Sequence, residues 1–127
     1  LFDNKNIKLF INIEENIIVH ANEALIMRMI DNLLSNALKY AETEVTVCLA
    51  RRNRIIFEVA DDGIGISDNE KKHIWDRFYK VDKSRTTTED NSSGLGLSIT
   101  KKIVELHDGR IAVLDNKPKG TRFVVNL

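Results

Sequence analysis

The sequence has little cysteine, no excess of charge of either sign and no long apolar run. Because Cys48 is its single cysteine, no internal disulfide can form, and we expect a reducing compartment. Lysine plus arginine equals aspartate plus glutamate at 19 each, so the charge excess of a nucleic-acid-binding surface is missing. No apolar run reaches about 18 residues, and no signal-peptide pattern occurs. The composition therefore predicts neither nucleic-acid binding nor a membrane span.

The usual P-loop pattern is also absent, which excludes ordinary P-loop NTPases. The 127 residues, 43% hydrophobic and 30% charged, are typical of one soluble globular domain that buries a core without disulfides. We therefore expect a single domain over residues 1–127. Because the chain begins in mid-pattern at Leu1 rather than at Met, we expect it to be an excised domain of a larger protein.

Two periodicities predict the secondary structure. Apolar residues that recur at every second position predict strands over residues 7–13, 43–51, 55–61, 110–115 and 121–127. Helical spacing predicts helices over residues 23–40, 67–75 and 97–107. Asn22 is the expected N-cap of the first helix, and Gly109 the expected left-handed residue that ends the last. The short connection at residues 52–54 predicts antiparallel neighbours.

The stretch Asp61-Asp62-Gly63-Ile64-Gly65-Ile66 is the most informative one. Strand alternation places Asp61 on the same face as Phe57 and Val59, so its carboxylate faces the core at the end of the strand. A buried carboxylate costs several kcal/mol unless it meets a donor, which a ligand amino group can supply. The glycines allow the backbone to turn and to approach a flat ligand. The simpler alternative is a turn that Asp61 merely caps.

The helix over residues 23–40 carries polar side chains beside its apolar stripe. Asn32, Asn36 and Lys39 follow one another at spacings of four and three, so they share one flank. Two amides and an ammonium along the margin of a core face predict a polar ligand at the boundary between helix and sheet. A solvated flank of an ordinary amphipathic helix is the alternative.

A long polar loop leads into the last helix. Residues 80–93 contain one strongly apolar residue, Val81, and a loop of this length is typically functional or mobile. Gly94 and Gly96 then open the helix, where free N–H groups can face a phosphate. With the Asn32 flank and the Asp61 stretch, these features can hold a nucleotide. The base would lie at the aspartate and the triphosphate between the asparagines and the glycine-rich helix start.

These motifs resemble, along essentially the whole chain, the ATP-binding catalytic domain of bacterial sensor histidine kinases in the GHKL superfamily. The matching stretches are residues 31–40, 61–66, 75–85, 94–99 and 119–121. The resemblance implies an α+β fold, a two-layer α/β sandwich. In it, a mixed, mostly antiparallel sheet of about five strands packs on about three helices, with a mobile ATP lid over about 80–93.

The resemblance also implies a role for each matching residue. Asp61 would accept a hydrogen bond from the adenine amino group, with Gly65 and Thr121 near the base. Asn36 would coordinate Mg²⁺, with Asn32 beside it. The other positions implied to bind ATP are Lys39, Tyr40, Gly63, Ile66, Lys80, Arg85, Gly94, Leu95, Gly96 and Leu97. The implied catalytic residues are Asn32, Asn36, Lys39, Lys80 and Arg85. Phe78 is expected to anchor the lid hinge in the core.

The implied reaction is transfer of the γ-phosphoryl group of Mg-ATP to a histidine on a helical-hairpin dimerisation domain. That domain is absent from this chain, so the chain is not expected to phosphorylate itself. Its implied partners are the hairpin domain of the same kinase and a response-regulator receiver domain with an acceptor aspartate. Neither nucleic acid nor direct membrane contact is implied. We expect a monomeric cytoplasmic domain of a homodimeric, membrane-anchored sensor kinase.

Two alternatives remain from the residues. Hydrolytic ATPases of this superfamily use a glutamate one helical turn before the metal-binding asparagine. Asn32 occupies that position here, and an amide cannot take a proton from water at neutral pH. An ATPase switch is therefore disfavoured. A non-catalytic, nucleotide-gated binding module is the second alternative, although the ligand positions all look intact.

Overall fold

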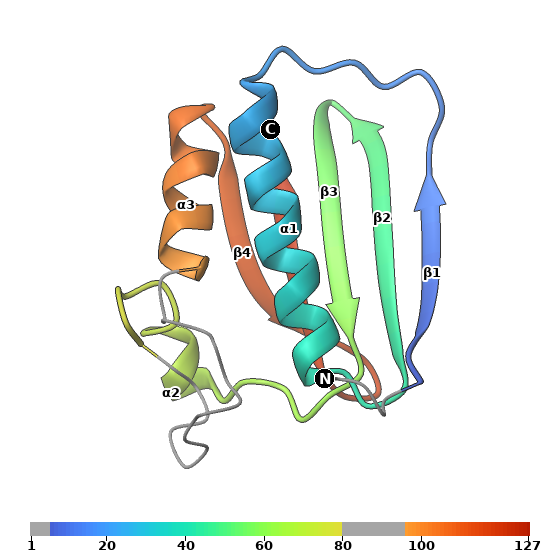
Figure 1. Ribbon diagram of the computed structural model, residues 1–127, viewed down its shortest axis with the longest axis vertical. Helices are drawn as coiled ribbons and strands as arrows, with labels where there is room; N and C mark the ends of the chain where they lie inside the picture. Colours follow the sequence, from blue (N-terminus) through green and yellow to red (C-terminus); the bar gives the residue numbers. More distant parts are fainter. Residues whose placement is uncertain (1–5, 80–95) are drawn as a thin grey trace.

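The computed structural model describes residues 6–79 and 96–127, which form two layers (Figure 1). The described strands are β1 (Lys8–Ile13), β2 (Glu44–Arg52), β3 (Arg54–Asp61), β4 (Arg110–Asp115) and β5 (Thr121–Asn126). The described helices are α1 (Glu23–Tyr40), α2 (Asp68–Lys71) and α3 (Gly96–Leu106). The sheet order is β1-β2-β3-β5-β4, with β1 parallel to β2 and the other pairs antiparallel. The predicted α+β sandwich with a mixed, mostly antiparallel sheet is confirmed.

Helix α1 lies across the sheet because its sequence combines a cap with an apolar stripe. The Asn22 side chain accepts the Leu25 N–H at 3.0 Å, which satisfies one of the free donors of the first turn. Met29, Leu33 and Ala37 recur every fourth residue and are fully buried against the sheet. The predicted helix and its N-cap are both confirmed.

Strand β3 is the central strand of the sheet, and it ends in a polar residue that faces the core. The hairpin from β2 turns at Asn53, which adopts a left-handed φ of 64°. The antiparallel register then places Asp61 of β3 directly opposite Thr121 of β5. Paired residues on neighbouring strands point to the same face, so these two side chains lie together at one end of the core.

The predicted ending of α3 at Gly109 is wrong in its detail. Asp108, with a φ of 59°, is the left-handed residue, and Gly109 is outside that region. Gly109 instead allows a close approach, because a Cβ there would lie 2.4 Å from the Asn126 carbonyl oxygen. Aspartate tolerates the left-handed conformation better than most residues, so Asp108 can adopt it. Gly109 is then needed for the close contact with Asn126.

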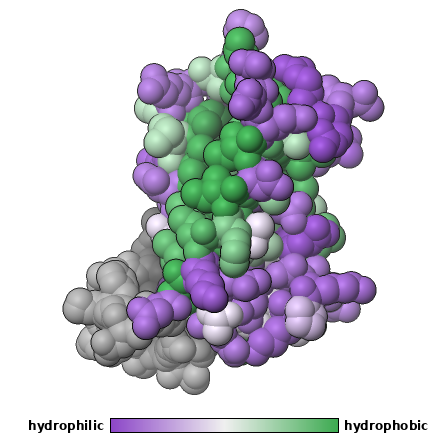
Figure 2. All heavy atoms as spheres, turned by 90° about the vertical axis from the view of Figure 1, so that its right-hand side faces the viewer, coloured by the Kyte–Doolittle hydropathy of each residue, from purple (hydrophilic) through white to green (hydrophobic). Residues whose placement is uncertain are grey.

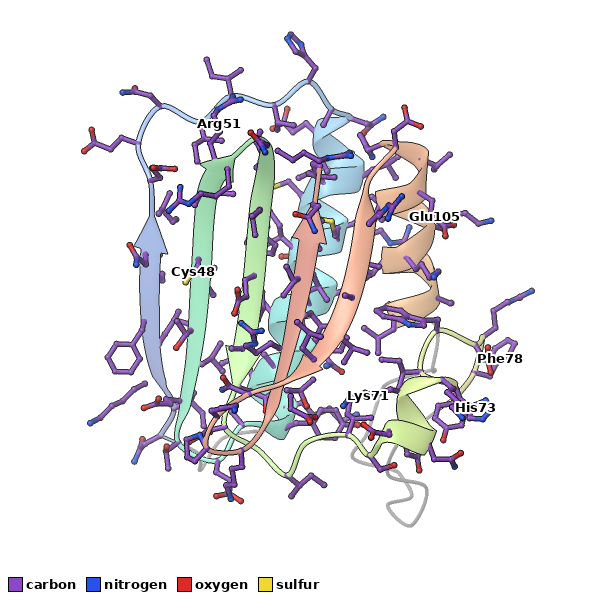
Figure 3. The ribbon with its side chains drawn as sticks, turned by 180° about the vertical axis from the view of Figure 1, so that it is seen from behind. Cys48, Arg51, Lys71, His73, Phe78 and Glu105 are labelled. Atoms are coloured by element: carbon purple, nitrogen blue, oxygen red, sulfur yellow. The ribbon has the colours of Figure 1, made fainter. Side chains whose placement is uncertain are left out.

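The segment after the glycines also differs from the prediction. Regular helix α2 ends at Lys71 rather than near Trp75, and turns follow. Phe78 does not anchor the core: it has a φ of 66° and is 62% exposed, pointing away from the sheet in Figure 3. Ile74 fills the core position, and the Trp75 ring packs edge-on against Phe123 with ring centroids 5.9 Å apart. The left-handed turn at Phe78 explains why its side chain leaves the core.

The outer face of the sheet, seen in Figure 3, carries both polar and apolar side chains in the described chain. Glu58 of β3 accepts a hydrogen bond from Arg122 of β5 at 2.9 Å. Cys48 lies opposite Glu58 on β2. Burial raises the pKa of the Cys48 thiol, and the Glu58 carboxylate raises it further. The cysteine is therefore a poor nucleophile.

Candidate functional site

A cleft of about 240 Å³ opens between the C-terminal half of α1, the end of β3 and the start of α3. It is lined by Asn32, Ser35, Asn36, Lys39, Tyr40, Asp61, Ile64, Gly65, Ile66, Ile74, Tyr79, Gly96, Leu97 and Thr121. The fold thus brings together most of the described residues for which the sequence predicted a binding role. Lys80, Arg85, Gly94, Leu95 and the predicted lid over 80–93 lie outside the described residues.

The floor of the cleft is the pair formed by Asp61 and Thr121. Each side chain is only 4% exposed, at the end of a buried strand. The Asp61 carboxylate accepts the backbone N–H of Gly63 at 2.8 Å. An ionised carboxylate offers about four acceptor positions, so it can accept a ligand donor as well as donors from the protein. The floor can therefore recognise a donor group on a ligand that enters the cleft.

Two glycines allow three segments to meet below this floor. A Cβ on Gly63 would lie 2.1 Å from the carbonyl oxygen of Tyr40, the last residue of α1. Gly120 has a φ of 112°, and a Cβ there would lie 1.9 Å from the Asp61 carbonyl oxygen. A side chain at either position would push the glycine's backbone away from the backbone segment that it contacts. Gly63 is thus a supporting residue beneath the cleft rather than one of its lining residues.

Asp62 fastens α1 to the end of β3. One of its carboxylate oxygens accepts the N–H groups of Glu42, Thr43 and Glu44 at 2.9, 3.0 and 3.1 Å, and the other accepts the Thr43 hydroxyl. Burial by itself raises the pKa of this carboxyl, but the hydrogen bonds outweigh burial and hold the pKa well below its ordinary value. The sequence interpretation did not single out Asp62, because its partners lie 18 to 20 residues earlier.

Asn32 joins the two long helices. Its amide nitrogen donates to the Gly96 carbonyl at 3.3 Å and to the Thr100 hydroxyl at 3.3 Å. Thr100 is fully buried, and its hydroxyl in turn donates to the Gly96 carbonyl at 2.8 Å. These bonds hold the first turn of α3 beside α1, so that Gly96 and Leu97 border the cleft.

Asn36 and Lys39 continue along the same wall of α1. Both line the cleft, as their shared flank predicted. The Lys39 ammonium nitrogen lies 5.2 Å from the centroid of the Tyr40 ring, within the range of a cation–π contact. This part of the cleft therefore presents an amide, an ammonium and a phenol ring to a ligand.

Four lining residues were missed by the sequence interpretation: Ser35, Ile64, Ile74 and Tyr79. Ser35 is an exposed residue of α1 outside the flank that Asn32, Asn36 and Lys39 share. Ile64 lies inside the first glycine-rich motif, and Tyr79 lies inside the stretch 75–85, so both could have been found. Ile74 could not have been predicted to line the cleft, because the sequence does not distinguish it from an isoleucine that only packs in the core.

The fold and this cleft define an ATP-binding α/β sandwich domain. The chain belongs to the family described as "Histidine kinase-, DNA gyrase B-, and HSP90-like ATPase", whose model matches residues 21–127. The prediction of an ATP-binding catalytic domain of the sensor-histidine-kinase type is thereby confirmed.

Relatives and solved structures agree with this assignment. The chain is 35% identical over 127 residues to the sensor histidine kinase YclK of Bacillus subtilis, covering 98% of this chain and 27% of that protein. It is 43% identical over 109 residues to the sensor protein CiaH of Streptococcus pneumoniae, covering 84% of this chain and 24% of that protein. The chain thus spans about a quarter of the length of these curated relatives.

Among solved structures, the mycobacterial sensor histidine kinase MprB matches with a TM-score of 0.79 and 26% identity, over 95% of this chain and 80% of that one. ShkA in complex with AMPPNP matches with a TM-score of 0.80 over 94% of this chain and 25% of that one. At 22% identity, that second match supports the fold alone. No helix in the described parts of the chain has the length and apolarity to cross a membrane.

Proposed function

We propose that this chain binds Mg-ATP in the cleft and transfers the γ-phosphoryl group to a histidine on a separate helical-hairpin domain of a sensor kinase. From there the phosphoryl group would pass to an aspartate of a response regulator. The observation that carries the proposal is the buried Asp61 carboxylate on the floor of a cleft whose α1 wall presents Asn36 and Lys39.

The base end of the cleft suits adenine. Asp61 accepts the exocyclic amino group, and Thr121 and Gly65 lie beside it on the same floor. Ile64, Ile66 and Ile74 supply apolar surface against which a flat ring can pack. A polar anchor within an apolar pocket is the usual way in which a protein orients a small aromatic ligand.

The α1 wall suits the phosphates. Asn36 offers an amide oxygen, and Mg²⁺ prefers such hard ligands while taking only one or two from protein and others from substrate phosphates. The described residues contain no cluster of three or more histidine, cysteine, aspartate or glutamate side chains that could hold a metal. One amide oxygen is a sufficient protein ligand for an ion that arrives with its nucleotide, and Mg²⁺ would neutralise phosphate charge. The same region is bordered by Lys39, Tyr40, Gly96 and Leu97. On the strength of the sequence motifs alone, we propose that the phosphates also contact Lys80, Arg85, Gly94 and Leu95.

Phosphoryl transfer rather than hydrolysis is supported by Asn32. Its amide nitrogen donates to Gly96 and to Thr100 of α3, and an amide is no base for water. Asp31 is the adjacent carboxylate, but its side chain points about 100° away around the helix and is exposed. Phosphoryl transfer requires positioning and charge neutralisation, which the cleft supplies.

The acceptor is proposed to lie outside this chain. The His107 imidazole accepts the Asn22 N–H at 3.1 Å through Nε2 and contacts the Ile103 carbonyl at 2.8 Å through Nδ1, so both nitrogens serve the fold. His73 lies 3.3 Å from the Asp76 carboxylate. We propose a cytoplasmic, membrane-anchored homodimeric kinase as the parent, with a receiver domain as the second partner.

Incubation with γ-labelled ATP and Mg²⁺ tests the proposal, with and without a hairpin domain that carries a phosphoacceptor histidine. Acid-labile label on protein and free phosphate are followed together, and a hairpin with glutamine in place of that histidine is the control. The expected result is label on the histidine hairpin only, with little free phosphate. Steady phosphate release without any hairpin would overturn it in favour of an ATPase switch. ATP binding with neither product would favour a nucleotide-gated module.

A further inference from the structure

Strand β1 is apolar and exposed. Its residues Leu9, Ile11 and Ile13 pair in register with Val45, Val47 and Leu49 of β2, so they point to the face that carries the helices. Val45 is fully buried, yet Ile11 is 58% exposed, and Leu9 and Ile13 are similarly open. The core face of the sheet thus continues past its helical cover onto β1.

Helix α1 turns an apolar margin toward this open part of the sheet. Met27, Leu34 and Leu38 recur at helical spacing on the flank opposite the one where Asn32 contacts α3. Met27 is 51% exposed, and Leu38 is also exposed. We call the surface between these residues and Leu9, Ile11 and Ile13 the β1–α1 groove.

The β1–α1 groove lies where the described helices leave the sheet uncovered. Helices α1 and α3 lie over β3, β5 and β4, and leave β1 and β2 without a helix of the described chain in front of them (Figure 1). Figure 2, which faces β1, shows apolar residues in a continuous band along this side. Continuous apolar patches of this kind mark interaction sites.

Two carboxylates lie on the α1 margin of the groove, and the exposed Arg51 side chain of β2 lies at one end of the same face. Glu23 and Asp31 are exposed on α1 beside Met27 and Leu34, and neither carboxylate forms an ion pair within residues 6–79 and 96–127. A partner with positive charge at this margin would be favoured in orientation and association rate. We propose that the β1–α1 groove receives an amphipathic α-helix of a partner protein, with an aliphatic stripe flanked by lysine or arginine.

A helix accounts for the surface better than an added strand. The N–H groups of Lys8 and Glu14 donate to Thr43 and Leu49 of β2, so the intervening residues of β1 direct alternate backbone groups to the open edge. A strand from a second copy could pair there. It would extend the sheet beyond β1 and leave Met27 and Leu38 on α1 uncovered, whereas a helix in the groove covers both walls.

The test uses a fluorescent, acetylated peptide of about 18 residues, composed of leucine and lysine in an amphipathic helical pattern. Its binding to the protein is followed by polarisation. Ile11→Asn is expected to weaken binding at least about tenfold, because a polar group then faces the aliphatic stripe. Phe10→Asn is the matched control: Phe10 is 49% exposed on the same strand but points to the opposite face, so it is expected to change binding less than about twofold.

A second pair of variants tests the helix wall. Met27→Gln is expected to weaken binding, and Ala24→Gln, which points outward on the same helix, is expected not to. A peptide with glutamate in place of lysine is expected to bind about tenfold less tightly. Circular dichroism and thermal unfolding establish that each variant is folded, and neither they nor the peptide titration require nucleotide, so this test is independent of the proposed function.

Three results would overturn the proposal. Equal losses in Ile11→Asn and Phe10→Asn would indicate edge pairing or unspecific binding rather than a groove. Equal binding of the lysine and glutamate peptides would show that positive charge on the partner helix plays no part in binding. Self-association of the protein in sedimentation experiments, lost in Ile11→Asn, would make a second copy the occupant.

Discussion

One oxygen of the Asp62 carboxylate lies 3.0 Å from the backbone nitrogen of Thr43, the last residue of the connection between α1 and β2. Asp62 follows Asp61 directly, and Thr43 comes three residues after Tyr40, which lines the cleft. The contact therefore fixes the α1 wall of the cleft relative to its floor. The two neighbouring aspartates have separate tasks: Asp61 faces the ligand, and Asp62 assembles the structure that holds it.

Replacing Asp62 by asparagine is expected to lower the free energy of unfolding by about 1–3 kcal/mol at neutral pH, toward the lower end because the carboxylate is partly exposed. The folded-state pKa is depressed, so the contribution of the carboxylate is full above the unfolded value of about 3.9 and is lost as pH falls toward the folded-state pKa. Urea unfolding of both proteins at pH 7 and near pH 3 measures this difference. A gap that stays constant between the two pH values would contradict the assignment.

Asp61→Asn is expected to weaken adenine-nucleotide binding roughly 10- to 150-fold, because a hydrogen bond to a charged acceptor is worth about 1.5–3 kcal/mol. Glu58→Gln is the control, since Glu58 lies on the same strand but on the outer face. Calorimetric titration with an ATP analogue compares the two variants. Unchanged affinity in Asp61→Asn would remove its role in base recognition.

Gly63→Ala and Gly96→Ala form a pair that compares a glycine in tight backbone contact with one that has room for a side chain. The first Cβ would lie 2.1 Å from the Tyr40 carbonyl oxygen, so we expect a destabilisation of about 1–3 kcal/mol or more. The second Cβ would lie 3.9 Å from the Asn32 side chain, the nearest neighbour among the described residues, at the first residue of α3, where alanine is a better helix former than glycine. Gly96→Ala is therefore expected to keep or raise the thermal midpoint. Thermal unfolding without nucleotide measures both, and a stable Gly63→Ala protein would contradict the close approach.

Asn32→Ala and Asn36→Ala should affect different properties. Loss of the bonds from Asn32 to Gly96 and Thr100 is expected to cost about 1–2 kcal/mol of stability without nucleotide. Asn36→Ala is expected to leave stability nearly unchanged but to abolish the dependence of ATP affinity on Mg²⁺. Unfolding curves and ATP titrations, with Mg²⁺ or with a chelator, distinguish the two. If Asn36→Ala weakened binding equally with and without Mg²⁺, its metal role would be wrong.

Local patterns in the sequence were sufficient for the elements and for most of the cleft. The period of α1, the alternation of the strands and the placement of Asp61 on the core face all follow from spacing along one element, so they could be predicted. Asn32, Asn36 and Lys39 share a flank for the same reason, and that flank lines the cleft. The ligand roles of these residues stay predictions.

Only the tertiary structure decided which contacts join elements far apart in the sequence. Asp62 binds a turn 18 to 20 residues earlier, and Gly109 is required by a carbonyl at the far end of β5, so neither task is visible in a local pattern. Alternation placed Leu9, Ile11 and Ile13 on one face, but their exposure depends on how far α1 and α3 cover the sheet. Periodicity determines which face a residue occupies; burial is determined by what other segments bring against that face.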